Sequence, residues 1–127
     1  MGNRLQTIVS HRDLRVWQEA MGLAEATYRT VADAPSRWRF ALADQAIRAA
    51  ASVPANIAEG YGRNSPGSYV QFLKVARGSL NELDTHILLA QRVGAFDSEQ
   101  AARLLEQSER VGKMLNALIK SVRSTVK

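Results

Sequence analysis

Residues 65–94 read SPGSYVQFLKVARGSLNELDTHILLAQRVG, and this stretch decides the fold class. Ser65 is a strong helix N-cap, and Pro66 fits the first helical position, where its missing N–H does no harm. Gly94 suits the residue just after a helix. Between these signals apolar residues recur every three or four positions, which predicts an amphipathic helix over about 65–93. The expected inward positions are Tyr69, Phe72, Ala76, Leu80, Leu83, Ile87 and Ala90, with Leu73 and Leu88 widening the face.

A second helix is predicted over about 13–33. Asp13 suits its first turn because the helix dipole stabilises a carboxylate there, and Pro35 ends the run. The same three-and-four spacing predicts the inward positions Leu14, Trp17, Met21, Ala24, Tyr28 and Val31. We therefore expect the aromatic and methionine side chains among them to be core residues.

A third helix is predicted over about 36–61, with an inward row rich in small residues. That row is Leu42, Ala46, Ala49, Val53 and Ile57. Pro54 lies inside the helix and removes one backbone hydrogen bond, at a cost of about 3 kcal/mol unless the helix bends. We expect that bend between Ala50 and Pro54. Gly60 and Gly62 should end the helix, since glycine permits left-handed conformations.

The fourth predicted helix spans about 98–124. Asp97 followed by Gln100 resembles a capping box. The expected inward positions are Leu104, Val111, Leu115, Leu118 and Val122. Because the connections are short, consecutive helices should run antiparallel. The prediction is a single all-α domain over residues 1–127, an antiparallel up-down-up-down four-helix bundle.

Composition restricts the classes of function. The chain has 127 residues, of which 46% are hydrophobic and 23% charged, as expected for one globular domain. It has no cysteine, which excludes disulfide and thiolate chemistry and favours a reducing cytoplasm. No signal peptide and no apolar run of about 20 residues occurs, so we expect no membrane association. The net charge of +5 favours polyanionic partners.

Three motifs carry a resemblance to a known family. They are residues 13–18 (DLRVWQ), residues 52–63 (SVPANIAEGYGR) and residues 78–83 (GSLNEL). They resemble the hallmarks of the bacterial four-helix-bundle proteins first noticed in intervening sequences of 23S ribosomal RNA genes, over about Asp13 to Phe96. The chain departs from the family pattern at Ala46, where a larger aliphatic residue is usual, which leaves the register of 36–61 open.

The resemblance implies a bundle that assembles as a homopentameric ring. It also implies a relationship to the accessory protein of diversity-generating retroelements, which binds nucleic acid and a reverse transcriptase. Self-assembly has indirect support from the sequence, because the predicted helix over 13–33 has apolar residues on more than one face. Beside its expected inward row lie Val16, Ala20 and Leu23.

Four different polar groups lie within about two helical turns of one another. They are the amide of Asn56, the carboxylate of Glu59, the phenol of Tyr61 and the guanidinium of Arg63. One interpretation is a ligand or partner site at one end of the bundle. The favoured interpretation is structural: either the segment lies at a subunit interface, or Glu59 and Arg63 form an i,i+4 ion pair and Asn56 bonds backbone near the expected bend.

Basic residues recur at helical spacing on the last predicted helix, namely Arg103, Arg110, Lys113, Lys120, Arg123 and Lys127. Such a row could follow a phosphate backbone, above all if a ring repeats it. The alternative is a solvated face diluted by Glu106 and Glu109. Trp38, between two arginines, is expected to be exposed and to serve subunit contact or base stacking.

No catalytic, cofactor or metal site is predicted. Glu82 and His86 are spaced i,i+4, but the chain lacks the Glu-x-x-His motif of di-iron bundles, and His11 is expected to be solvated. We expect a non-enzymatic oligomeric scaffold that binds structured RNA or DNA, or a nucleic-acid-processing protein, through basic surfaces. The alternative is a protein-binding or structural oligomer with no nucleic-acid role. An enzyme acting around Glu59 is a third, disfavoured class.

Overall fold

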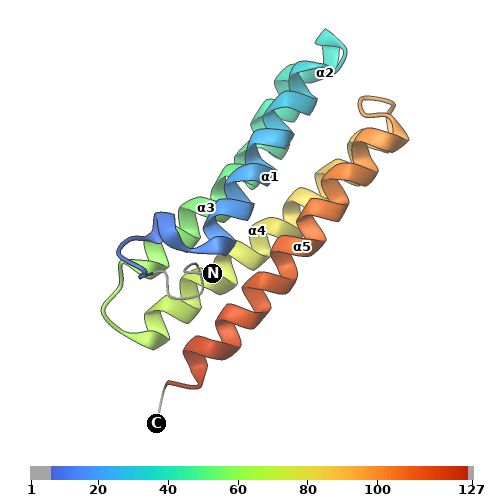
Figure 1. Ribbon diagram of the computed structural model, residues 1–127. Coiled ribbons are helices and arrows are strands. Elements are labelled where there is room, and N and C mark those ends of the chain that lie inside the picture. Colours follow the sequence, from blue (N-terminus) through green and yellow to red (C-terminus); the bar gives the residue numbers. More distant parts are fainter. Residues whose placement is uncertain (1–6, 126–127) are drawn as a thin grey trace.

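The computed structural model describes residues 7–125, and its long elements are helices (Figure 1). In chain order the elements are the 3-10 turn η2 (His11–Asp13), α1 (Arg15–Ala32), α2 (Ser36–Leu42), the π-helical segment η3 (Ala43–Ile47), α3 (Arg48–Tyr61), α4 (Pro66–Arg92) and α5 (Ser98–Arg123). α2, η3 and α3 follow one another directly and make one long helix. The predicted all-α class with four helices is confirmed, and residues 7–125 contain no strand.

The four long helices pack around one apolar core. α1 turns into α2, and α4 into α5, at the upper end of Figure 1, while α3 joins α4 at the lower end. α3 packs against α1 and α4, and α5 packs against the same two helices. Each helix therefore buries one face in the core.

The predicted ends of α4 and α5 are confirmed. The Ser65 hydroxyl accepts a hydrogen bond from the Ser68 N–H at 3.1 Å. Asp97 Oδ1 accepts from the Gln100 N–H at 2.7 Å, and Gln100 Oε1 accepts from the Asp97 N–H at 2.9 Å, which completes the capping box. Gly94 follows α4 with a φ of 83°, the only positive φ in the described residues.

The predicted inward row of α1 is displaced around the helix. The residues of α1 that are buried are Val16, Ala20, Leu23, Ala24, Thr27 and Val31. Met21 is 45% exposed and Tyr28 53% exposed, so the prediction that they are core residues is wrong. Both rows have three-and-four spacing, and the smaller side chains of the buried row allow α1 to approach its neighbours closely. Thr27 is tolerated there because its hydroxyl donates to the Leu23 carbonyl at 2.9 Å.

The inward row predicted for the third helix is confirmed, since Leu42, Ala46, Ala49, Val53 and Ile57 are all buried. The departure from α geometry lies at Ala43–Ile47, upstream of the bend predicted between Ala50 and Pro54. Arg48–Tyr61 is α-helical through Pro54, which is itself buried. Packing around Pro54 thus offsets the one hydrogen bond that a proline removes.

The rows of α4 and α5 are confirmed in part. Leu88 is 47% exposed and does not widen the buried face of α4, whereas Ser79 is buried there. On α5 the buried residue of the last turns is Ile119, while Leu118 and Val122 are partly buried against the core. Within the described residues, none of these helices has the length and apolar character needed to traverse a bilayer.

Candidate functional site

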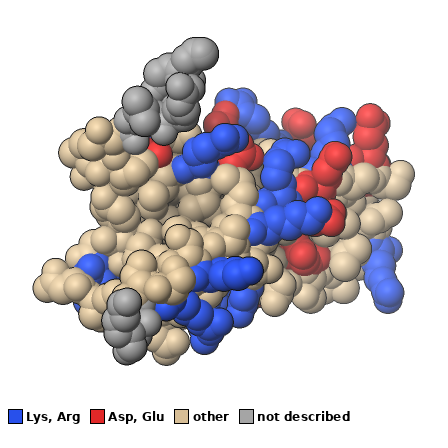
Figure 2. All heavy atoms as spheres, turned by 60° about the horizontal axis from the view of Figure 1, so that its bottom comes forward, with Lys and Arg blue, Asp and Glu red and all other residues tan. Residues whose placement is uncertain are grey.

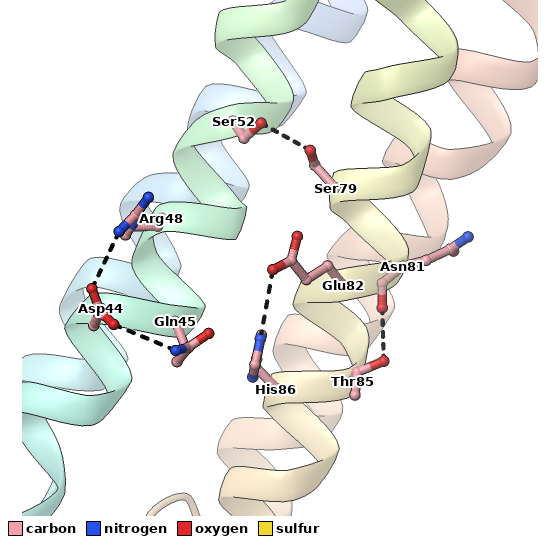
Figure 3. A network of polar contacts seen from close by, with 9 residues as sticks. All are labelled: Asp44, Gln45, Arg48, Ser52, Ser79, Asn81, Glu82, Thr85 and His86. Atoms are coloured by element: carbon pink, nitrogen blue, oxygen red, sulfur yellow. Dashed lines mark hydrogen bonds and ion pairs between the residues drawn. The ribbon is translucent and has the colours of Figure 1, made fainter.

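The motif of residues 52–63 lies where α3 contacts α4. Ser52 Oγ and Ser79 Oγ are 2.8 Å apart and share a hydrogen bond between the two helices, as Figure 3 shows. Asn56 Nδ2 donates to the Ser52 carbonyl at 2.8 Å and to Ser52 Oγ at 2.9 Å. Asn56 therefore bonds backbone near Pro54, as predicted, and also supports the polar link between the helices.

The other polar groups of this motif make contacts within the chain. Arg63 Nη2 lies 2.6 Å from Glu59 Oε2, so the predicted ion pair is present, and both side chains are about half exposed. The Arg63 guanidinium also lies 4.6 Å from the centre of the Phe72 ring, within cation–π range. Tyr61 meets Tyr69 edge to face at 6.2 Å. Burial, and secondarily Tyr61, raises the pKa of Tyr69.

Gly60 has a different role from the predicted one. It lies inside α3 and is buried, and neither it nor Gly62 has a positive φ. A Cβ at Gly60 would lie 2.8 Å from Phe72 Cβ and 3.2 Å from the Tyr69 carbonyl oxygen. Gly60 therefore permits a close approach of α3 and α4, and it does not terminate the helix through a left-handed conformation.

Half of the predicted basic row of α5 is paired with glutamate. The pairs are Arg103 with Glu99 at 3.4 Å, Arg110 with Glu19 of α1 at 3.4 Å, and Lys113 with Glu109 at 3.8 Å. Lys120 and Arg123 have no acidic partner within ion-pair distance in the described residues. Lys127 lies outside the described residues. The row is therefore close to neutral in its first half and positive near its end.

Figure 2 shows how acidic and basic side chains are distributed over one face of the molecule. Lys and Arg atoms alternate with Asp and Glu atoms toward the right of the view. Toward its lower edge a group of Lys and Arg atoms has no acidic atoms beside it. On this face the basic side chains without acidic neighbours gather in one region, where the positive field is strongest.

A groove of about 780 Å³ lies between α1 and α3. The side of the groove formed by α1 is lined by Trp17, Met21 and Tyr28. The side formed by α3 is lined by Pro54 and Ala58. The aromatic and methionine residues predicted for the core thus form an apolar surface groove. The sequence alone did not indicate this groove, because the residues that line it from α1 have the spacing of an inward row.

Trp38 is not the exposed aromatic residue that the sequence predicted. Its side chain is partly buried and packs against the core, with the Arg37 guanidinium 5.5 Å from the ring centre. Arg39 Nε donates to the Ala34 carbonyl at 2.8 Å. The exposed aromatic side chain of α2 is Phe40, at 86%.

A polar link between α4 and α5 was also missed. Ser108 Oγ donates to Asp84 Oδ1 at 2.5 Å, and Arg77 Nη1 donates to Asn116 Oδ1 at 2.8 Å. Burial raises the pKa of Asp84, and the hydrogen bond from Ser108 opposes this effect. The sequence feature that could have indicated this link is Ser108, a serine at an inward position of the apolar row of α5.

The two histidines lie in different surroundings. His86 Nε2 lies 3.9 Å from Glu82 Oε2, and the described residues contain no group of three acidic or histidine side chains that could hold a metal ion. His11, predicted to be solvated, is partly buried and meets the Trp17 ring edge to face at 5.1 Å.

Comparison with known proteins identifies the family. The sequence matches the family described as 23S rRNA-intervening sequence protein over residues 12–117. The fold is similar to the crystal structure of a protein of unknown function from the S23 ribosomal protein family of Bacteroides thetaiotaomicron VPI-5482, with a TM-score of 0.75 and 23% identity. That similarity covers 83% of this chain and 98% of the other. No curated protein matches the sequence. The chain therefore belongs to the family of 23S rRNA-intervening sequence proteins.

Proposed function

We propose that this chain is a non-enzymatic scaffold, an up-down-up-down bundle that assembles with copies of itself into a ring of five. The observation that carries the proposal is the groove between α1 and α3, where Met21 and Tyr28 are about half exposed. Open apolar surfaces of this kind typically mark a protein–protein contact. The number five comes from the family resemblance.

A closed ring requires two different surfaces on each copy, because every subunit contacts the next one head to tail. The groove is one such surface. The second is an apolar ridge at the end of α4, formed by Leu88 and Leu89 of the helix and by Val93, which follows it; these side chains are 47%, 53% and 46% exposed. Insertion of the ridge of one copy into the groove of the next would cover both surfaces.

Light scattering of two variants tests this arrangement. Met21→Glu places a charge in the groove and Leu88→Glu places one on the ridge, so each should reduce the oligomer to the 14.0 kDa chain. An equimolar mixture of the two should form a dimer, since one intact groove and one intact ridge remain. Gln71→Glu, an exposed position on α4, is the control and should leave the mass unchanged. A wild-type mass of one chain at all concentrations would contradict the proposal.

A second candidate function is binding of structured RNA or DNA, or of a nucleic-acid-processing protein. It is supported by Lys120 and Arg123 near the end of α5, which have no acidic partner within ion-pair distance among residues 7–125, and by the relationship to the retroelement accessory protein that the resemblance implies. A ring would repeat this positive surface five times and strengthen its field. The rival is a purely structural or protein-binding oligomer, supported by the three basic residues already paired with glutamate. The absence of cysteine supports a cytoplasmic location for either.

A further inference from the structure

The groove between α1 and α3 has one charged residue in its lining. Among the described residues that line it, Glu25 alone has a charged side chain. Glu25 lies four residues after Met21 and three before Tyr28, so the three side chains share one side of α1. The contact surface that α1 offers to a partner therefore has a carboxylate between its exposed apolar residues.

The carboxylate of Glu25 can accept a second cation. Arg29 Nε and Nη2 donate to Glu25 Oε2 at 3.0 and 2.7 Å, and both side chains are more than half exposed. An exposed ion pair of this kind contributes little to the stability of the chain. Both bonds go to the same oxygen, and a carboxylate has two oxygens that can accept. Glu25 Oε1 is thus available to a donor from outside the chain.

The apolar ridge of α4 has one charged neighbour of the opposite sign. A hollow of about 220 Å³ beside the ridge is lined by Thr85, Leu88, Leu89 and Arg92. Arg92 follows Leu88 by four residues and Leu89 by three, so it lies on the same side of the helix. Within the part of the chain that the structure describes, Arg92 has no acidic partner at ion-pair distance. Its guanidinium is therefore free to pair with another molecule.

Apolar contact alone does not fix where the ridge lies along the groove. At the helical rise per residue, Trp17 and Tyr28 are about 17 Å apart along α1, whereas Leu88 and Val93 are only about 8 Å apart. The hydrophobic effect is not directional, so several positions of the ridge would bury similar areas. Opposite charges across an interface select one register among them.

We propose that the Arg92 guanidinium of one copy pairs with the Glu25 carboxylate of the next copy, and that this ion pair sets the register of the ridge in the groove. The inference rests on the proposed self-assembly and identifies the polar contact that gives it specificity. Charge complementarity supports a second copy as the partner, since the groove has one acidic residue in its lining and the hollow beside the ridge has one basic residue. Every interface of the ring would contain one such pair.

Charge reversal on each side of the interface tests the pair. Arg92→Glu brings two carboxylates together, and Glu25→Lys brings two cations together. Each should raise the protein concentration needed for half-assembly at least about tenfold, as measured by sedimentation velocity. The double variant with both substitutions restores opposite charges at every interface, so its half-assembly concentration should return close to that of the wild type.

Two matched controls separate the pair from net charge. Lys120→Glu makes the same change of charge as Arg92→Glu, but at the opposite end of the bundle in Figure 1, near the end of α5. Glu106→Lys makes the same change as Glu25→Lys on α5, outside both the groove and the hollow. Both should assemble like the wild type. All four positions are exposed, so the chain should fold in each variant.

The possible failures of the inference and of the proposed function differ. A wild-type protein that remains a single chain at all concentrations overturns both. If Met21→Glu and Leu88→Glu dissociate the oligomer but the two charge reversals do not, self-assembly stands and the ion pair is overturned. The ion pair is also overturned if the double variant assembles no better than the weaker of the two single variants.

Discussion

At the scale of single residues, Gly60 sets the distance between α3 and α4. An alanine is normally favoured over glycine inside a helix by about 1 kcal/mol. At Gly60 its Cβ would lie 2.8 Å from Phe72 Cβ, an atom that cannot move without the α4 backbone. Gly60→Ala should therefore lower the free energy of unfolding by about 1–3 kcal/mol, the usual cost of overpacking. Gly78→Ala, with open space around its Cβ, is the matched control and should raise stability in the same urea titration. If both substitutions stabilise the protein, the close approach at Gly60 is not limiting.

At the scale of the element, α5 owes its start to the reciprocal bonds between Asp97 and Gln100. Asp97→Ala leaves backbone N–H groups of the first turn without an acceptor and should cost about 1 kcal/mol of unfolding free energy. Asp33→Ala makes the same change of charge at the C-terminus of α1, where the helix dipole disfavours a carboxylate, and should be neutral or slightly stabilising. Urea denaturation of both variants measures the difference. Equal losses in the two would show that the effect comes from overall charge and not from capping.

At the scale of the whole molecule, ion pairing decides where the net positive charge is available. Reversal of Lys120 and Arg123 to glutamate should weaken binding to structured RNA at least tenfold at low salt and should flatten the salt dependence. Reversal of Arg103 and Lys113, which changes the net charge equally, should have a smaller effect because these residues already pair with glutamates. Fluorescence anisotropy at several salt concentrations compares the two double variants. Equal effects would indicate a response to net charge alone, and no RNA binding by the wild type would favour the purely structural oligomer.

The sequence by itself determined the four helices, the Ser65 and Asp97 caps and the family, because these depend on signals within a few residues of one another. It also predicted the Glu59–Arg63 pair, since i,i+4 neighbours meet on any helix.

Only the tertiary structure decided which of two adjacent rows of α1 faces the core. Both rows have helical spacing, and the choice depends on the shapes of the neighbouring helices, which bury Leu23 and leave Met21 half exposed. The same holds for Arg110 with Glu19 and for Ser108 with Asp84, since these contacts join different helices. Local sequence encodes the elements, whereas the groove between α1 and α3 and the ion pairs between helices arise from how those elements pack together.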